Sequence, residues 1–526
     1  MKALCEILKK TLLMGNQNFR QILHIRSMAI QTKQSNSINT KLTRKLGLLG
    51  LTATGICAMF GASINVVPFM IQRNVPGIGP YVLPAFALAA LPAIFAALAY
   101  SILASAMPRA GGSYIYASRG LHPYLGFVAS FSQWFGLSIV IGVISYIIVP
   151  FIRDVAIGLE WITTADFLEL GAVRVGLALL LLWLFVGINL RGTQAYEKTL
   201  IPLMLLMFVL GSIVIVAGFY FNQADFAQAL SQEGKSIPST SVSFSWETLL
   251  SAAALLFSSF IGFDAIAQAG GEATNPSRNL PLAIGLAIAT VGGFYFLFTT
   301  AVYHAVPWSF VASQALEKDI SAPGMLAYLL PASLGVAILA GAAIALINDL
   351  PAMLLSVSRL MFAWAEDGIF PRAIANVHPR FYTPHIALLC SGSIATVGIL
   401  GSHFAGDFFL GIDIMVTSMM VNFLLMCITL LHLPKRNPDI ARQITVFQSL
   451  SIRKFIGWTG TLLLSFFLLI HTWKDLSSDK AAWYFHSTPV WLLVMLMASL
   501  FYWYRYSLLK KSGKDIKTIF QTLPAE

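Results

Sequence analysis

Long apolar blocks alternate with short polar segments along most of the chain. The blocks are about 18 to 26 residues long, the length of helix that crosses a hydrocarbon core of about 30 Å. They lie at residues 47–71, 80–104, 123–151, 172–189, 199–221, 247–270, 281–305, 331–358, 384–402, 408–432, 455–473 and 488–508. Backbone polar groups in lipid must be satisfied within the segment, and the blocks lack the alternation of barrel strands. The pattern therefore predicts an all-α integral membrane protein with about twelve transmembrane helices.

Composition and charge agree with a protein surrounded by lipid. Of the 526 residues, 57% are hydrophobic and 11% charged, too little charge for the surface of a soluble protein. With the N-terminus inside, seven of the 34 Lys and Arg residues fall in outer segments: Arg73, Arg153, Arg174, Lys235, Lys318, Lys474 and Lys480. This bias predicts a plasma membrane protein with both termini in the cytoplasm. The net charge of +11 then faces anionic lipid and does not indicate nucleic acid binding.

Two of the apolar blocks are interrupted by small residues and proline or glycine. The first contains Gly61-Ala62-Ser63-Ile64-Asn65, followed by Pro68, and the sixth contains Ser258 to Asp264, followed by Gly270-Gly271. An unwound helix frees backbone N–H and C=O groups, whose partial charges can bind a carboxylate and an ammonium. An isolated Gly61 would be explained by close helix packing. A pair of broken spans, one in each half, instead predicts a transporter site built from inverted repeats.

Three carboxylates fall inside predicted spans, where ionisable groups are costly and often functional. Asp349 follows Asn348 in the eighth span, so its surroundings suit Na⁺ or a carried proton; the alternative is an acid satisfied by Ser or Tyr from another helix. Asp264 lies beside the second break and could hold a substrate amine, carry a proton or clamp a helix end. Asp413 lies near the outer end of its helix, within reach of water.

The chain carries no sequence motif of an enzyme. It contains neither HExxH, nor a Walker phosphate loop, nor GxSxG. Its four cysteines, Cys5, Cys57, Cys390 and Cys427, have neither metal-site nor disulfide spacing. We therefore expect a non-enzyme without a cofactor, apart from Na⁺ or H⁺ as a coupling ion.

Four segments, in order, resemble motifs of the amino acid–polyamine–organocation transporter superfamily, and the resemblance runs from about residue 45 to 470. They are Gly61-Ala62-Ser63-Ile64-Asn65, then Met107 to Tyr114, then Phe260 to Asp264 with Gly271 to Pro281, and finally Ser358-Arg359-Leu360 with Glu366 to Pro371. The resemblance implies a leucine-transporter-like fold with a five-plus-five inverted repeat around broken helices 1 and 6. The implied divisions are an N-terminal tail (1–44), repeat 1 (45–221), an extracellular loop (222–246), repeat 2 (247–432), helices 11 and 12 with the preceding loop (433–508), and a C-terminal tail (509–526).

The resemblance also implies where substrate binds. In relatives the first break binds a carboxylate and carbonyls of the sixth helix bind an amine. The corresponding positions here are Gly61, Ala62, Ser63 and Ile64, then Ser258, Ser259, Phe260 and Ile261, with Asp264 beside them. Three positions depart from the family pattern. Ser63 adds a hydroxyl where a glycine is usual, Ser258 is small where some relatives place an aromatic ring, and Lys198 lies at the mouth of the fifth span rather than inside it.

These observations favour a secondary transporter of small amino acids, a symporter or an exchanger that works by alternating access. Asp349 and Asn348 are the expected ion-coupling residues. The runner-up is a transporter of polyamines or small amines, because acids lie in the membrane and the first break is altered. A membrane sensor that kept the fold and lost turnover is the alternative from another class.

Overall fold

Eleven apolar helical segments are long enough to cross a membrane in the part of the chain that the computed structural model describes, residues 42–405, 409–478, 482–513 and 515–524. Ten of them consist of one long helix, which in the case of α4 is preceded by a 3₁₀ turn: α4 (Val82–Ala106), α6 (Pro123–Gly158), α8 (Gly171–Leu190), α9 (Thr193–Tyr220), α13 (Pro276–Ala305), α16 (Ala332–Glu366), α17 (His385–Ala405), α18 (Phe409–Arg436), α20 (Leu450–Leu476) and α21 (Ser487–Lys511). The predicted tail 1–44 lies almost wholly outside the described residues. The all-helical membrane fold is thus confirmed.

The first predicted span is divided into two helices. It consists of α2 (Leu48–Asn65) and α3 (Val67–Asn74), which meet at Val66 with φ −122°. Pro68 explains the interruption, because it has no N–H to donate to the carbonyl four residues earlier. The break thus follows the predicted Gly61–Asn65 segment instead of lying within it. The unbroken apolar part, Leu48–Gly61, is too short to span alone, so a count of twelve stays a prediction.

The sixth span is interrupted at the predicted place. It consists of α11 (Trp246–Leu256), the 3₁₀ turn η2 (Phe257–Phe260) and α12 (Ala265–Gln268), followed by η3 (Gly270–Glu272). Gly262 lies in the gap with φ +137°, and a Cβ there would lie 2.4 Å from the carbonyl oxygen of Ala58 in α2. Only glycine fits, because the backbone is left-handed and the two interrupted segments touch at this point.

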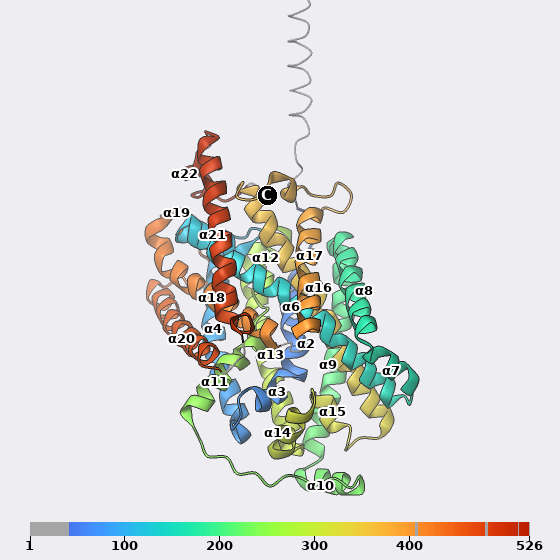
Figure 1. Ribbon diagram of the computed structural model, residues 1–526. Coiled ribbons are helices and arrows are strands. Elements are labelled where there is room, and N and C mark those ends of the chain that lie inside the picture. The colour runs from blue at the N-terminus through green and yellow to red at the C-terminus, as the bar shows by residue number, and fades with distance from the viewer. Residues whose placement is uncertain (1–41, 406–408, 479–481, 514, 525–526) are drawn as a thin grey trace, which may run out of the picture.

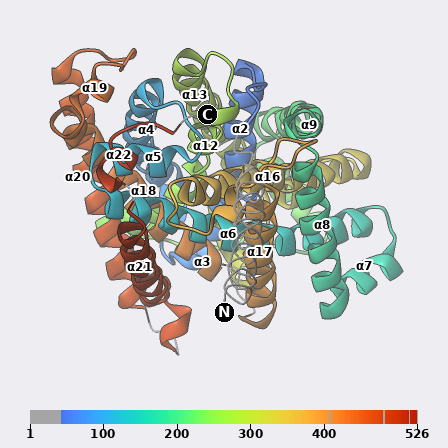
Figure 2. The same cartoon turned by 90° about the horizontal axis from the view of Figure 1, so that it is seen from above.

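The interior of the bundle is formed by α6, α16 and the interrupted sixth segment. The apolar stretches of these segments are 78%, 83% and 89% buried, against 22% for α8 and for α21. α6 packs against α16, α17 and α18, while α2 packs against α9, α13 and α16. Seen from above, α7 and α8 lie at one side of the bundle and α19 and α20 at the other (Figure 2).

Short helices mark the two ends of the bundle (Figure 1). We call one the α22 end, where α19 (Pro438–Ala441) and α22 (Ile516–Ile519) lie, and the other the α10 end, where α10 (Gln223–Gln232) and α14 (Trp308–Glu317) lie. The remaining short elements are α5 (Gly112–Gly120), α7 (Ile162–Glu169), α15 (Ala322–Leu326), η1 (Gly79–Tyr81), η4 (Arg372–Ala375) and η5 (Trp483–Phe485). The orientation in the membrane and the inverted repeat stay predictions.

Candidate functional site

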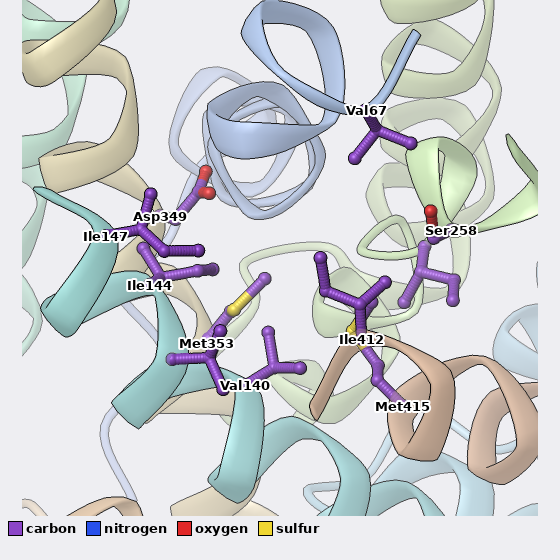
Figure 3. A pocket seen from close by; sticks show the side chains of 11 residues that line it. Val67, Val140, Ile144, Ile147, Ser258, Asp349, Met353, Ile412 and Met415 are labelled. Atoms are coloured by element: carbon purple, nitrogen blue, oxygen red, sulfur yellow. The ribbon is translucent and has the colours of Figure 1, made fainter. Parts of the chain in front are cut away.

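A narrow cavity lies where the interrupted segments face α6, α16 and α18 (Figure 3). Its volume of about 20 Å³ is room for about one water molecule. Most lining side chains are aliphatic or thioether groups, and two are polar. The lining residues are Val67, Val140, Val143, Ile144, Ile147, Ser258, Ile261, Asp349, Met353, Ile412 and Met415. The predicted residues Ser258, Ile261 and Asp349 are therefore brought together around one cavity.

Asp349 joins the cavity to the first interrupted segment. Its Oδ1 accepts the backbone N–H of Gly61 at 2.9 Å, a contact between residues 288 positions apart. A Cβ at Gly61 would lie 1.8 Å from Asp349 Oδ2, so the absent side chain is what lets the carboxylate approach the helix backbone. A backbone donor that the sequence analysis assigned to the substrate is thus bonded to a carboxylate of the protein itself.

Asn348 is turned away from the cavity towards α2 and α9. Its amide nitrogen donates to Cys57 Sγ at 3.0 Å and to the carbonyl of Leu200 at 3.4 Å. Its Oδ1 is buried and has no hydrogen-bond partner among the described residues. Buried amide oxygens are normally paired, so this oxygen is an acceptor still available to a cation or a water molecule.

The four predicted residues of the sixth segment separate into two groups. Ser258 and Ile261 line the cavity, and the buried hydroxyl of Ser258 has no partner among the described residues, so it can bond a ligand. Phe260 instead lines a lateral cavity of about 420 Å³ between α4 and α13, with its ring 5.1 Å from that of Phe86. Ser259 is buried and does not line the central cavity.

Asp264 is fully buried but does not line the cavity. One carboxylate oxygen accepts the N–H of Gly262 at 3.1 Å, and the other accepts the amide of Gln133 from α6. These are the contacts of a clamp that fixes the end of the interruption to α6. In the first segment, Ile64 is buried away from the cavity, and the side chains of Ala62 and Ser63 lie outside the described residues.

A wider, charged vestibule of about 570 Å³ is lined by residues of α6, α7, α8, α15 and α16. Of these elements, α15 lies towards the α10 end (Figure 1). It shares Ile147 with the cavity, and its lining residue Val66 adjoins Val67. Charges of both signs line it: Arg153, Asp154, Glu169, Arg174, Lys318 and Asp319. The side chain of Ile147 therefore forms part of the wall of both the vestibule and the narrow cavity.

Two buried ion pairs connect the segments at the α22 end. Arg359 of α16 binds both carboxylate oxygens of Glu272 in η3, at 3.0 and 2.6 Å. Arg119 of α5 binds both oxygens of Asp367, at 2.6 and 2.8 Å. Burial alone would lower the pKa of the Arg119 guanidinium, but Asp367 raises it above its ordinary value. In both pairs the two-point contact compensates for the lost water.

These four side chains are not among the residues that the sequence predicts to have a functional role. Glu272, Arg359 and Asp367 lie in the motifs that carry the family resemblance, but a motif does not show which charges meet. The available signal was that opposite charges flank spans at the same predicted side of the membrane. Pairing them requires the tertiary packing of α5, η3 and α16.

Apolar helices, two of them interrupted beside a central cavity and with a charged vestibule next to it, are features of membrane transport proteins. The sequence model of the amino acid permease family matches residues 46–499, which is most of the chain. The chain belongs to this family. It is therefore a multi-pass transporter and not an enzyme.

The names of similar proteins refer to different substrates. Human cationic amino acid transporter 4 is 28% identical over 68% of this chain, which covers only 55% of the human protein. The branched-chain amino acid permease BcaP of Bacillus subtilis is 26% identical over 76% of this chain and 83% of its own length. The methylthioribose transporter of the same bacterium is 24% identical over 79% of this chain and 86% of its own length. The family supports amino acid transport, and these names do not single out one substrate.

Proposed function

We propose that the chain is a secondary active transporter that moves small neutral amino acids across the plasma membrane by alternating access. The observation that carries the proposal is the cavity of about 20 Å³ where both interrupted helices meet α6, α16 and α18. A substrate bound there contacts both helices, so its binding can favour one arrangement of them over another. The narrowness implies that the lining must open for any amino acid to enter.

The lining favours a substrate with a short apolar side chain. Among the described residues that line the cavity, one is acidic and none is basic, and the remaining surface is mostly Val, Ile and Met. An aliphatic side chain gains by burial against this surface, whereas a cationic side chain would lose its hydration. The name of the branched-chain permease relative agrees with this choice. The amine would bind Ser258 and neighbouring carbonyls, and the carboxylate would bind the backbone near Gly61.

Coupling to an ion gradient is assigned to Asp349, as a carrier of H⁺ or a ligand of Na⁺. Its buried carboxylate contacts the first interrupted segment and lines the cavity. A change in its charge therefore alters the electrostatic interactions of both the segment and the cavity. The adjacent Asn348 carries a second candidate oxygen, its Oδ1, which has no partner among the described residues and would reach a bound cation only if the side chain turned towards the cavity.

A small amine is the second candidate substrate. Asp349 is the single ionisable group among the lining residues, and a carboxylate attracts an ammonium in a low-dielectric site. A polyamine with several charges is disfavoured, because one carboxylate cannot compensate them.

Uptake into proteoliposomes tests the proposal. The purified full chain would be reconstituted, and entry of radiolabelled valine, alanine, arginine and isobutylamine would be followed with an imposed proton or sodium gradient. We expect gradient-driven uptake of valine or alanine that protein-free liposomes lack. Uptake of isobutylamine in preference to valine would favour the second candidate, and uptake of none would contradict a transport function.

A further inference from the structure

The backbone N–H of Gly61 is a hydrogen-bond donor for two carboxylates, that of Asp349 and that of the proposed substrate. In the structure it bonds to Asp349 Oδ1 at 2.9 Å, and Oδ2 lies 1.8 Å from where a Cβ of Gly61 would be. The carboxylate therefore covers the face of the helix at which an amino acid's own carboxylate would approach. The carboxylates of Asp349 and of the substrate cannot occupy this space together. One of them must therefore leave the Gly61 N–H before the other can bind it.

Charge makes this exclusion stronger. Asp349 is buried, and the rest of the cavity lining is hydrocarbon, thioether and one hydroxyl. Two carboxylates held at contact distance in such a site repel each other strongly, and neighbouring carboxylates commonly share a proton for this reason. Among the titratable groups around Asp349, Cys57 of α2 is close enough to interact with its charge, and Tyr196 of α9 donates to Thr54. The basic residues Arg153 of α6 and Arg174 of α8 line the vestibule and not the cavity, and Arg359 of α16 is paired with Glu272.

We infer that Asp349 competes with the substrate's carboxylate for the Gly61 N–H, and that one proton on Asp349 decides the competition. This inference rests on the proposed function and gives its coupling a mechanism. A proton from the vestibule converts the carboxylate into a neutral acid, a much weaker acceptor, which releases the N–H. The substrate's carboxylate then accepts that N–H. On the other side of the membrane substrate and proton leave together, and Asp349 recovers its bond to Gly61, so one proton moves with each substrate.

A proton fits these surroundings better than Na⁺. A hard cation needs several oxygen ligands, whereas the described lining residues offer two side chains with oxygen atoms, Asp349 and Ser258. The Oδ1 of Asn348 faces away from the cavity, together with the amide that contacts α2 and α9. A proton requires no ligand shell beyond Asp349 itself.

Binding of two matched ligands across a pH range tests the inference on the unaltered protein. Valine and isobutylamine differ by the carboxylate alone. Ligand-induced thermal stabilisation of the purified full chain would give both affinities between about pH 5 and 8. We expect valine affinity to fall by about tenfold per pH unit once Asp349 is charged, because binding then takes up one proton. The affinity for isobutylamine should not fall, since this amine has no carboxylate to accept the Gly61 N–H.

Variants assign the effect to Asp349. In Asp349→Asn the competitor is permanently neutral, so valine affinity should be high and independent of pH; Asp349→Ala gives the same test if the first variant folds poorly. Asp413→Asn removes another carboxylate of the membrane region and should keep the tenfold slope. Equal slopes for both ligands, a slope that persists in Asp349→Asn, or recovery of valine affinity at high pH on adding Na⁺ would overturn the inference. Binding of neither ligand at any pH would instead overturn the proposed function, and the inference with it.

Discussion

Gly61 shows how one residue without a side chain sets the geometry of the site. Its place in α2 allows Asp349 to reach the helix backbone, since a Cβ would lie 1.8 Å from Oδ2 and 2.4 Å from Cγ of that carboxylate. We expect Gly61→Ala to lower the apparent Tm of the purified protein, because overpacking in a filled interior costs about 1–3 kcal/mol. The better helix propensity of alanine offsets about 1 kcal/mol of this at most.

The double variant Gly61→Ala/Asp349→Ala separates the clash from other effects. Removing the carboxylate leaves room for the new methyl group, so the double variant should melt higher than Gly61→Ala alone. Differential scanning fluorimetry of the parent, both single variants and the double variant measures this. A Gly61→Ala variant as stable as the parent would show that α2 and α16 are not in such close contact.

The lining of the cavity predicts selectivity at the same scale. Ser258 presents an unpaired hydroxyl, whereas Met353 presents an apolar surface. We expect Met353→Glu to weaken valine binding and improve arginine binding, since an added carboxylate compensates a cationic side chain. Ser258→Ala should weaken the binding of every amino acid substrate by about 1 kcal/mol, because it removes one hydrogen bond without adding charge. Competition against radiolabelled valine measures both, and unchanged selectivity in Met353→Glu would place the substrate's side chain elsewhere.

At the scale of elements, the sequence determines which segments are helices better than where they are interrupted. Length and apolarity alone predict α8 and α17 closely, because each covers the hydrocarbon core. The predicted third span ends at residue 151, but α6 continues to Gly158, since nothing in the sequence stops a helix where it leaves the membrane. The break of the first segment lies at Val66, set by Pro68, and not at the small residues that suggested it.

Contacts between elements could not be predicted in the same way. Asp349 was a candidate because of its depth in a span, yet its bond to Gly61 depends on the packing of α16 against α2. Asp264 was also a candidate, and its bond to Gln133 depends on α6. Sequence patterns indicate that a buried carboxylate needs a partner, whereas the partner itself follows from the tertiary structure.

The ion pair between Arg359 and Glu272 joins α16 to the segment that follows the second interruption. Both side chains are at most 2% exposed. We expect Arg359→Ala or Glu272→Ala alone to lower the free energy of unfolding by about 3–5 kcal/mol, because each leaves an uncompensated buried charge. The double variant should recover part of this loss. Thermal melts of the four proteins give the coupling energy.

The exposed pair Arg442–Asp439 is the matched control for that cycle. Its side chains are 79% and 85% exposed, so its removal should change stability by less than about 1 kcal/mol. If the double variant Arg359→Ala/Glu272→Ala were less stable than both single variants, the pair would not be the contact that holds these segments together.

For the whole molecule, the two ends differ in access to the site. The vestibule of about 570 Å³ is lined by α15, on the side of the α10 end, whereas the buried pairs Arg359–Glu272 and Arg119–Asp367 lie at the α22 end. With the predicted orientation, the vestibule lies on the outer side of the cavity and the two buried ion pairs lie on the cytoplasmic side. A cysteine at Ala327, which lines the vestibule, should therefore react with a membrane-impermeant thiol reagent added to intact cells.

The matched position is Gln443, which is exposed beside α19 at the α22 end. A cysteine there should react only after the cells are permeabilised, and the parent chain supplies the background of its own cysteines. If Gln443→Cys reacted in intact cells and Ala327→Cys did not, the orientation would be the reverse of the prediction. Added valine should slow the reaction at Ala327→Cys, because closure around the substrate must cover the vestibule before the α22 end can open. A rate that valine leaves unchanged would mean that binding does not close this side, and alternating access would then require another gate.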